Sequence, residues 1–592
     1  AGAPDDRQIG IVERLEQHHL VARLDEAEQA GGQRFGVGRR RAVMGVKTEV
    51  AQDTQGILVD PRRSQTAARA AIHLQPRPGE DVTILAGIIN IIIANGWHDA
   101  AFVDENVSGF DDLARAVSGF TPAYVAERAD LPEAQLLSAA ELFATHGTKR
   151  GMVNAGTGAN FAMHGNLVEY LCLCLTTICG RWQRAGEKVT RPNALLPAFT
   201  AKAQAHPPYE GWGYGERLRV RGLTDAVCGM PTAALADEIL LEGDGQVKAL
   251  ICIGGNPMAA WPDQRKTHRA LQSLELLVTL DTEMSLTSRL ADYVIAPMMQ
   301  METPAMTMGS ELIKYYTSGT GIPAAYAQYT PRLVDPPPGS DLIEEWKFFL
   351  GLTKRMDLEL WFVNFFGGGG GKFMESPPIV LQMTGDTELS TEELFEQMCA
   401  TSRIPLDEVR RHPHGAIFDV DAVVQERDAD STARLDVGNG YMLAALETVL
   451  DEEAEGARGD AAFPFRLIPR RHPNFMNSSG TALAALNRGK PYNPVYMHPD
   501  SAAELGLRPG SSVLVTSRHD CVPAVLEADD SVRLDVVAMH HAFGGLPDED
   551  DEFRERGTNV GRLVSTEVDY DPITGLPRQG NIAVRIGPLG QG

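Results

Sequence analysis

The sequence predicts a multidomain α/β protein in which parallel-sheet domains precede a C-terminal β-barrel. Apolar runs alternate with helical patterns between residues 56 and 450, an order that is typical of parallel sheets. Short strands separated by turns fill residues 463–592, a spacing that is typical of a barrel. A chain of 592 residues also exceeds what one hydrophobic core supports. We therefore expect three or more domains.

The segment from Lys248 to Thr303 contains the clearest strand–helix–strand unit. An apolar run at 249–253 meets the motif GGNP at 254–257, a helical stretch follows, and a second apolar run at 276–280 ends at Asp281. Ligands of parallel sheets bind at the carboxyl ends of strands. Glycines let the backbone approach a ligand, a helix N-terminus attracts anions, and a carboxylate suits a ribose hydroxyl or a purine N–H. The unit predicts a nucleotide-containing ligand, although a plain tight turn explains GGNP equally well.

An earlier segment has the same character. A short strand ends at Asp60, a second strand spans 71–75, and a Pro-Gly turn leads to an apolar helix within 80–96 that acidic residues cap and a glycine stops. Just past the first strand, Asp60, Arg62 and Arg63 are suited to hold a ribose and a phosphate by charge-assisted hydrogen bonds. A solvated loop is the alternative reading of these charges.

The first 55 residues differ from the rest of the chain. They show one amphipathic helical pattern at 11–27, a basic, glycine-rich tail and no strand pattern, so we expect an atypical and poorly ordered leader. A metal site at His18 and His19 is disfavoured, because adjacent side chains on a helix point in different directions.

The middle of the chain carries weaker signals. Helical patterns fill 99–150, and a strand, a glycine-rich loop at 155–160 and a helix follow, but the loop does not match a dinucleotide fingerprint. The irregular stretch 188–222 is long enough to line a site or to be mobile. The glycine run 367–371 precedes Lys372 and Phe373 instead of Lys-Ser or Lys-Thr, so it predicts a surface loop and not a phosphate-binding loop.

Composition excludes several classes of function. The formal net charge of -25 disfavours a nucleic-acid surface, because phosphates would be repelled. Seven cysteines without a CxxC pair indicate a reducing compartment, and Cys172, Cys174 and Cys179 fit a buried apolar helix. The apolar run 82–94 is shorter than the ~20 residues that cross a bilayer. No export signal is evident, so we expect a cytoplasmic protein without a membrane span.

Four motifs, in their order along the chain, resemble those of the molybdopterin oxidoreductase family. They are VDPRR with the turn PGED, KALICIGGNP, LDTEMSLTSRLADYVIAP with Glu302, and PYNPVYMHPDSAAELGLRPGSSVLVTSR. The resemblance runs from about Gly56 to the C-terminus. This family includes formate dehydrogenases, assimilatory nitrate reductases and dimethyl sulfoxide reductases. Its members bind molybdenum or tungsten through two molybdopterin guanine dinucleotides.

The resemblance implies a division of the chain and a set of cofactor-binding residues. Residues 56–150 become the remnant of a first α/β cofactor domain, 151–450 a second α/β cofactor domain with long loops, and 463–592 a barrel of the double-psi type after an acidic linker at 451–462. One guanosine-diphosphate arm is placed at Asp60, Pro61, Arg62, Arg63, Gly79, Glu80 and Asp81, and the other at Gly255, Asn256, Pro257, Leu280 and Asp281. The pterins are placed near Thr157, Gly158 and Phe161. The barrel covers both arms with Pro469, Arg470, Arg471, His472, Asn474, Asn477 and Ser478 in its first contact loop and with Asn559 and Gln579 in its last. For His472, a purely structural loop histidine is the alternative.

The chain departs from the family pattern at its start. In the family, a Cys-rich segment that binds a [4Fe–4S] cluster and a region that supplies the metal's Cys, selenocysteine or Ser ligand precede the VDPR-type strand. Here that space holds the leader, and no C-x₂-C-x₃-C pattern is present. We therefore expect an N-terminally truncated chain, for which we name no metal ligand and no catalytic residue.

Three functional hypotheses follow. The first is molybdenum-dependent two-electron redox of a small substrate, with an electron-transfer subunit or carrier as partner. The second is an inactive remnant that at most binds the guanine dinucleotide. The third, an NAD-dependent dehydrogenase, requires a G-x-G-x-x-G motif directly after a strand, and the chain has none.

Overall fold

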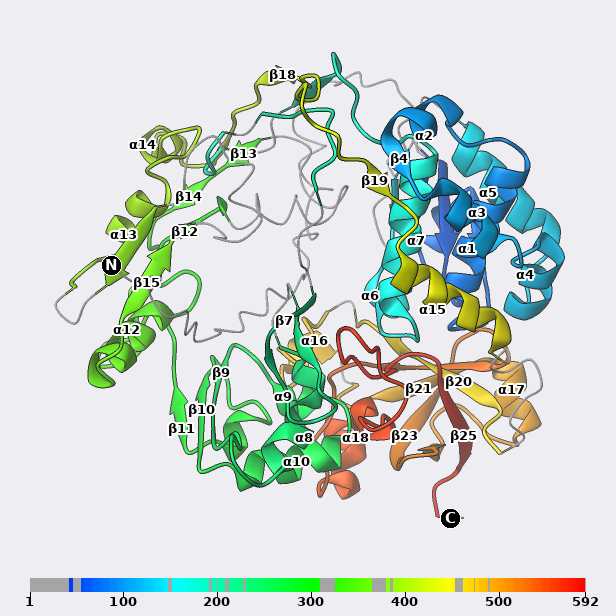
Figure 1. Ribbon diagram of the computed structural model, residues 1–592. Coiled ribbons are helices and arrows are strands. Elements are labelled where there is room, and N and C mark those ends of the chain that lie inside the picture. Colours follow the sequence, from blue (N-terminus) through cyan, green and yellow to red (C-terminus); the bar gives the residue numbers. More distant parts are fainter. Residues whose placement is uncertain are drawn as a thin grey trace.

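The computed structural model describes residues 42–45, 55–146, 152–190, 194–198, 200–207, 212–226, 230–308, 325–364, 379–383, 387–452, 462–472, 474–487 and 490–590. The elements are arranged in a ring (Figure 1). A first lobe in blue and cyan contains 42–45 and 55–178, a second lobe in green spans 235–295, and a third lobe at the left contains the described residues between 305 and 417. The C-terminal barrel, in orange and red, lies beside the first and second lobes.

Some of the sequence predictions fall outside the described residues. These are the helix at 11–27 with His18 and His19, the glycine run 367–371 with Lys372 and Phe373, and most of the acidic linker at 451–462.

The first lobe is built on a parallel sheet of four strands in the order β3-β2-β1-β5. The strands are β1 (Ala42–Gly45), β2 (Gln55–Val59), β3 (Ile72–Leu74) and β5 (Met152–Asn154). The predicted strands that end near Asp60 and span 71–75 are therefore confirmed. The expectation of no strand before residue 56 was wrong, because β1 lies between β2 and β5 inside the sheet.

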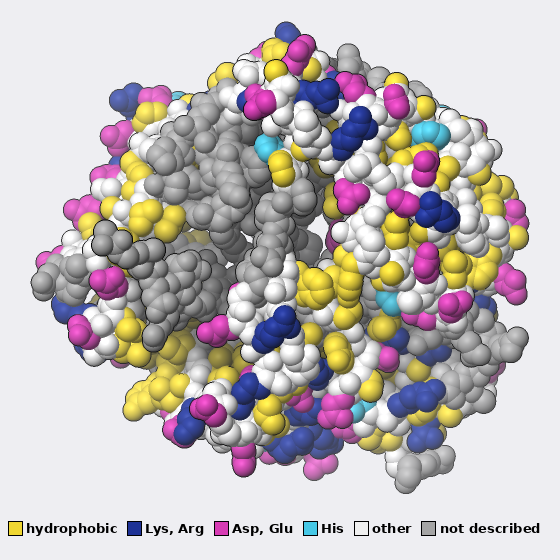
Figure 2. All heavy atoms as spheres, in the orientation of Figure 1, with side chains coloured by type: hydrophobic (Ala, Val, Ile, Leu, Met, Phe, Trp, Pro, Cys, Tyr) yellow, Lys and Arg dark blue, Asp and Glu magenta, His cyan; other side chains and the backbone are white. Residues whose placement is uncertain are grey.

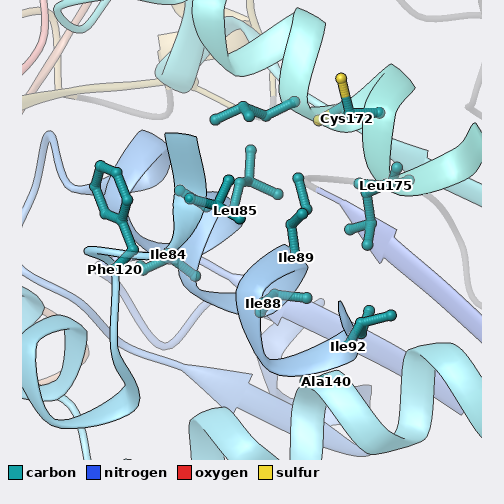
Figure 3. Close-up of a cluster of buried hydrophobic side chains, with 14 of the residues drawn as sticks. Ile84, Leu85, Ile88, Ile89, Ile92, Phe120, Ala140, Cys172 and Leu175 are labelled. Atoms are coloured by element: carbon teal, nitrogen blue, oxygen red, sulfur yellow. The ribbon is translucent and has the colours of Figure 1, made fainter. Parts of the chain in front are cut away.

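Helix α1 (Asp81–Ala94) forms the centre of the first lobe (Figure 3). Its side chains Ile84, Ile88, Ile89 and Ile92 are each 0% exposed. A helix that is apolar on every side must be covered on every side. The covering helices are α3 (Phe110–Val117), α4 (Pro122–Ala129), α5 (Glu133–Thr145) and α7 (Gly165–Ile178). The distant α15 (Gly440–Asp451) packs on α3 and α7, and its Leu446 joins the same core.

The cysteines of α7 belong to this core, as the sequence predicts. Cys172, Cys174 and Cys179 are buried, and burial raises the pKa of each thiol. A thiol with a raised pKa is protonated and inert at neutral pH.

The second lobe contains the strand–helix–strand unit that the sequence predicts. Strands β9 (Ala249–Ile253), β10 (Leu276–Leu280) and β11 (Tyr293–Ile295) form a parallel sheet in the order β11-β10-β9. Helices α8 (Leu235–Leu240) and α10 (Gln264–Ser273) contribute Ile239 and Leu271 to a core that also contains Leu277 of β10. The stretch after GGNP is a single turn, α9 (Pro257–Ala260), followed by α10.

The third lobe is assembled from short elements. Its strands form antiparallel pairs, and α12 (Glu345–Arg355) is the longest helix among its described residues. The elements are β12 (Ala305–Met306), β13 (Tyr326–Ala327), β14 (Tyr329–Thr330), α12, β15 (Leu360–Val363), β16 (Val380–Met383), α13 (Thr391–Met398), α14 (Leu406–Arg410) and β17 (Ala416–Ile417).

The C-terminal residues form a closed six-stranded barrel in the order β20-β24-β21-β23-β22-β25. Its strands are β20 (Phe465–Arg470), β21 (Pro494–Met497), β22 (Ser512–Ser517), β23 (Cys521–Ala528), β24 (Val536–His540) and β25 (Ile582–Pro588), and the short helix α17 (Pro499–Glu504) follows β21. Alternate residues such as Val513 and Val515 fill the interior. The barrel prediction is therefore confirmed.

Acidic and basic side chains are interspersed over the face drawn in Figure 2. Within the described part of the chain, no helix is both long enough and apolar enough to cross a bilayer.

Candidate functional site

The turn after β2 is fixed against the barrel. Asp60 Oδ1 accepts a hydrogen bond from Arg62 N at 2.9 Å, which closes the turn. Arg63 N donates to Ser531 O at 2.8 Å, and Arg62 forms an isolated bridge with Val532. Gln75 Nε2 of the neighbouring segment donates to Pro61 O at 3.1 Å. The predicted strand-end residues therefore lie directly beside the barrel.

Two arginines and two histidines meet at this boundary. We name them the Arg62 cluster: Arg62, Arg470, His472 and His540. Arg470 ends β20 and stacks its guanidinium over the Tyr496 ring at 3.9 Å. Burial and the neighbouring Arg470 lower the pKa of Arg62. Burial, His472, Arg470 and Arg62 lower the pKa of His540 to about 3. Positively charged side chains in a half-buried space favour the binding of an anion.

Glu80 and Asp81, the acidic pair at the start of α1, lie in different surroundings. Glu80 is buried, and its Oε2 accepts hydrogen bonds from Arg128 Nε at 2.8 Å and from Thr83 Oγ1 at 2.7 Å. Its carboxylate is thus occupied by the protein itself. Burial raises the pKa of Asp81 to about 6, and Glu80 and Asp60 add to the shift.

The Pro-Gly turn meets the end of the barrel. Gly79 has φ of +93°, and a Cβ at this position would lie 2.3 Å from Asn581 Nδ2. A side chain at residue 79 would therefore be strained and would displace the barrel segment.

The glycine-rich loop after β5 meets the same segment of the barrel. Phe161 O accepts hydrogen bonds from Gln579 N at 2.9 Å and from Gly580 N at 3.0 Å. Thr157 begins the short helix α6 (Thr157–Asn160), and a Cβ on Gly158 would meet nothing within 4 Å. Asn160 donates Nδ2 to Glu169 at 2.9 Å, but its buried Oδ1 has no hydrogen-bond partner among the described residues.

The GGNP turn is braced from both sides. Gly254 has φ of +54° and donates its N–H to Leu280 O at 2.8 Å, which ties the turn to the end of β10. Asn256 Oδ1 accepts from Thr287 Oγ1 at 2.9 Å, and Pro257 begins α9. A Cβ on Gly255 would meet only Ile253 O, at 3.7 Å, so one side of this turn is open.

Asn559 joins the barrel to the GGNP turn. It is 0% exposed, its Nδ2 donates to Ala259 O at 2.8 Å, and its Oδ1 accepts from Gly561 N at 2.7 Å. The amide is satisfied by protein groups, so Asn559 positions α9.

Asp281 is half-buried at the end of β10. Its Oδ1 accepts from Glu283 N at 3.3 Å, and its Oδ2 accepts from Ser288 Oγ at 3.5 Å, both long contacts. Burial and Asp281 raise the pKa of Glu283, which also accepts a backbone hydrogen bond from Gly480 of the barrel.

The barrel loop after β20 runs from the Arg62 cluster to this second strand end. His472 Nδ1 accepts from Asn474 N at 3.1 Å, and its ring stacks on Phe475 at 4.1 Å. Asn474 Nδ2 donates to Leu486 O at 2.9 Å, and Arg471 donates to Asn477 Oδ1. Two further predicted residues are Pro469, which pairs with Met539 in the barrel, and Ser478, whose carbonyl accepts from Thr481 Oγ1.

The structure thus gathers the predicted residues along one boundary. The β2 turn, the glycine-rich loop and the GGNP turn each meet the barrel. Sequence reasoning missed His540 and Asn581, because each lies within or beside a barrel strand and reads as part of its core. Among the described residues, no group of three or more His, Cys, Asp or Glu side chains could hold a metal ion.

Comparison with known proteins identifies the family. The model described as "Molybdopterin oxidoreductase" matches residues 40–313, and the one described as "Molydopterin dinucleotide binding domain" matches residues 465–583. The chain belongs to the molybdopterin oxidoreductase family. Its members are oxidoreductase enzymes. The match begins at residue 40, so family resemblance includes β1 and starts earlier than Gly56.

Individual relatives within the molybdopterin oxidoreductase family are distant. The chain is 25% identical to the F420-dependent formate dehydrogenase 2 subunit alpha of Methanococcus maripaludis, over 88% of this chain and 70% of that one. It is 23% identical to the dimethyl sulfoxide/trimethylamine N-oxide reductase of Rhodobacter capsulatus, over 86% of this chain and 63% of that one. Against the F420-dependent formate dehydrogenase subunit alpha of Methanocaldococcus jannaschii, the matching region spans 43% of the relative's length.

The fold is shared with a solved structure. Acetylene hydratase from Pelobacter acetylenicus matches with a TM-score of 0.68 and 18% sequence identity, over 92% of this chain and 78% of that chain. The mixed α/β architecture of this chain is thus shared with that structure over most of its length.

Proposed function

We propose that this chain binds molybdenum or tungsten through two molybdopterin guanine dinucleotides and takes part in two-electron redox of a small substrate. One observation carries the proposal. Polar loops at the carboxyl ends of β2, β5 and β10 lie along one barrel, held by Arg63 to Ser531, Phe161 to Gln579 and Glu283 to Gly480. Such strand ends are the ordinary ligand sites of parallel sheets, and two of them supply the two arms of a long ligand.

The residues present fit such a group. His540 Nδ1 and Asn160 Oδ1 are buried and lack partners among the described residues, so each offers a hydrogen bond to a ligand. Gly158 and Gly255 leave open space where a side chain would stand. Arg62 and Arg470 place positive charge at the barrel boundary of a protein whose formal net charge is -25.

In this proposal the Arg62 cluster holds the pyrophosphate of one arm, and Asp60 holds its ribose. Gly255 and Asp281 hold the other arm, where the carboxylate accepts hydrogen bonds from a ribose hydroxyl or the guanine. Glu80 and Asn559 act indirectly, since their side chains are engaged with Arg128 and Ala259. When bound, the group supplies two-electron redox chemistry at the metal, and the protein supplies position and electrostatics.

The substrate class that we favour is a small oxyanion or acid, as in formate dehydrogenases or nitrate reductases. The formate dehydrogenase alpha subunits among the relatives support this choice and also support an electron-transfer subunit or carrier as partner. A cytoplasmic location is part of the same proposal.

The test is an anaerobic assay of the purified full chain together with metal analysis. Metal-loaded protein should reduce benzyl viologen with formate or oxidise reduced viologen with nitrate. Bound metal and guanine nucleotide without turnover on either substrate would favour the alternative, a chain that binds the dinucleotide without catalysing its redox reaction. Protein without metal and without guanine nucleotide would contradict both.

A further inference from the structure

His540 is a buried histidine of the Arg62 cluster, and the proposed function leaves its protonation open. It ends β24 and is 3% exposed. Its backbone N–H and C=O are both bonded to the Asn493 side chain at 3.0 Å, so the residue is held in place independently of its ring. Ring atom Nε2 lies 3.4 Å from the Tyr496 hydroxyl. Ring atom Nδ1 has no partner among the described residues.

The groups that face this ring come from several elements, and two of them, Arg470 and Arg62, are cations. His472, from the loop after β20, lies edge to face at 5.0 Å between ring centroids. Arg470 ends β20, and Arg62 follows β2 in the first lobe. Tyr496 of β21 completes the surroundings at 5.6 Å between ring centroids.

The acidic groups nearby are already engaged. Asp529 pairs with Arg470 at 2.5 Å, and Asp60 accepts from the backbone of Arg62. Burial is the main effect that disfavours a second proton on the imidazole, and His472, Arg470 and Arg62 add to it although Asp529 pairs with Arg470. The pKa of His540 is about 3, so the ring is neutral in the free protein at neutral pH.

We infer that His540 binds the pyrophosphate of a guanosine diphosphate ester together with Arg62 and Arg470, and that its imidazole takes up a proton as the anion binds. The inference rests on the proposed function, because it concerns how one cofactor arm is held. It goes further in making the loading of that arm dependent on pH.

The direction of the pH dependence follows from charge. A bound diester pyrophosphate brings negative charge beside the imidazole and raises its pKa above the value in the free protein. The complex then holds more protons than its separate components. Affinity consequently falls as pH rises through the pKa of His540 in the complex, by at most about tenfold per pH unit for one proton.

The experiment is isothermal titration of the full chain, prepared without molybdenum cofactor, with GDP-mannose. This ester has a pyrophosphate that does not titrate near neutral pH, so the ligand itself contributes no proton. Titrations in buffers of different ionisation enthalpy, at about pH 6 and about pH 8, give the number of protons taken up. For the wild type we expect net uptake of up to one proton and tighter binding at the lower pH.

Two variants test whether His540 is the group that takes up the proton. His540→Gln keeps a polar side chain and should abolish most of the uptake and the pH dependence. His498→Gln, in a barrel histidine that contacts Asp500 outside this cluster, should behave as the wild type. Circular dichroism and the melting temperature report whether each variant folds.

The outcomes separate the two proposals. Binding by the wild type without proton uptake overturns the inference alone and needs no variant. Equal uptake by wild type and His540→Gln also overturns it, because another group would then carry the proton. Failure of the wild type to bind GDP-mannose at all overturns both the inference and the proposed cofactor site.

Discussion

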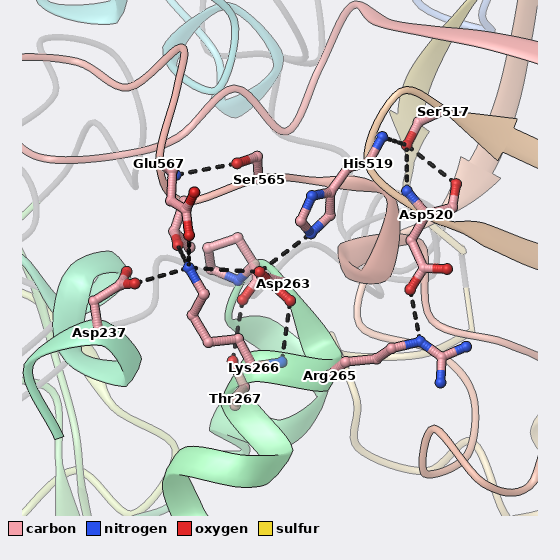
Figure 4. A network of polar contacts seen from close by, with 12 residues as sticks. Asp237, Asp263, Arg265, Lys266, Thr267, Ser517, His519, Asp520, Ser565 and Glu567 are labelled. Carbon is pink, nitrogen blue, oxygen red and sulfur yellow. Dashed lines mark hydrogen bonds and ion pairs between the residues drawn. The ribbon is translucent and has the colours of Figure 1, made fainter. Parts of the chain in front are cut away.

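His519 Nε2 of the barrel lies 3.1 Å from Asp263 Oδ2, which caps helix α10 of the second lobe. This ion pair belongs to a network that joins the two units (Figure 4). Lys266 Nζ, one turn along the helix, reaches Asp237 at 2.8 Å, Thr566 Oγ1 at 2.8 Å and Glu567 at 2.9 Å. The network places the barrel against the lobe that carries the GGNP turn.

The His519–Asp263 pair makes the stability of this boundary depend on pH. The hydrogen bond to Asp263 raises the pKa of His519 above its ordinary 6.5. Its stabilisation is therefore complete below about pH 6.5 and is lost as pH rises through the folded-state pKa. Because the histidine is one-third exposed, we expect an effect of only about 0.5–1 kcal/mol.

The measurement compares the free energy of unfolding at about pH 6 and about pH 8. His519→Gln should lose the part of the pH dependence that the pair supplies. His412→Gln, on an exposed histidine near Glu408 in the third lobe, serves as the control. An identical pH profile for wild type and His519→Gln would show that the pair contributes nothing.

Lys266→Met should destabilise the protein strongly. The amine is buried, and its hydrogen bonds to Asp237 and Glu567 raise its pKa although burial opposes the shift, so it stays charged. Removing it leaves Asp237 with only the longer contact to Arg221 and Asp263 with only His519, at a cost of about 3 kcal/mol in urea unfolding. Lys248→Met breaks the exposed pair with Glu275 and should cost less than about 1 kcal/mol. Similar costs for the two variants would contradict a buried network.

The Glu80→Gln variant tests whether Glu80 stabilises the fold or binds the cofactor. The carboxylate pairs with Arg128 at 2.8 Å, and both side chains are almost fully buried. We expect a loss of about 3 kcal/mol in stability, because an unpaired guanidinium would stay buried. Glu141→Gln, on the exposed side of α5, should be neutral. Unchanged stability with a loss of bound guanine nucleotide would instead place Glu80 on the cofactor.

For Asp281→Ala we expect the opposite of Glu80→Gln: nearly unchanged stability and less bound guanine nucleotide. The Asp281 carboxylate makes only long hydrogen bonds, so the variant should lose less than about 1 kcal/mol of stability. If the carboxylate anchors a guanosine, the guanine nucleotide content of the purified protein should fall several-fold. Asp244→Ala, an exposed carboxylate in the same lobe, should keep its full content. Unchanged guanine nucleotide content in Asp281→Ala would favour the alternative, in which GGNP is a plain tight turn without a ligand.

Much of the fold follows from local pattern. The apolar runs of β9 and β10 and the all-apolar helix α1 are long enough to be recognised, and the strand spacing after residue 463 predicts the barrel. Strand β1 is not recognisable, because four residues, AVMG, carry no periodicity and are strands only through their parallel neighbours.

The site residues illustrate the same limit. Asp60 and Arg62 are found because they follow a strand, which is a local signal. The engagement of Glu80 depends on Arg128, 48 residues away, and that of Asn559 on Ala259, 300 residues away. His540 ends an apolar strand and reads as core, and only its unpartnered Nδ1 distinguishes it.

The most direct measurement of the central claim is the ratio of guanine nucleotide to metal in the purified full chain. Acid hydrolysis followed by chromatography gives GMP, and mass spectrometry of the metals gives molybdenum and tungsten. A paired dinucleotide site predicts two GMP for each metal atom. Protein that contains neither metal nor GMP would contradict the account.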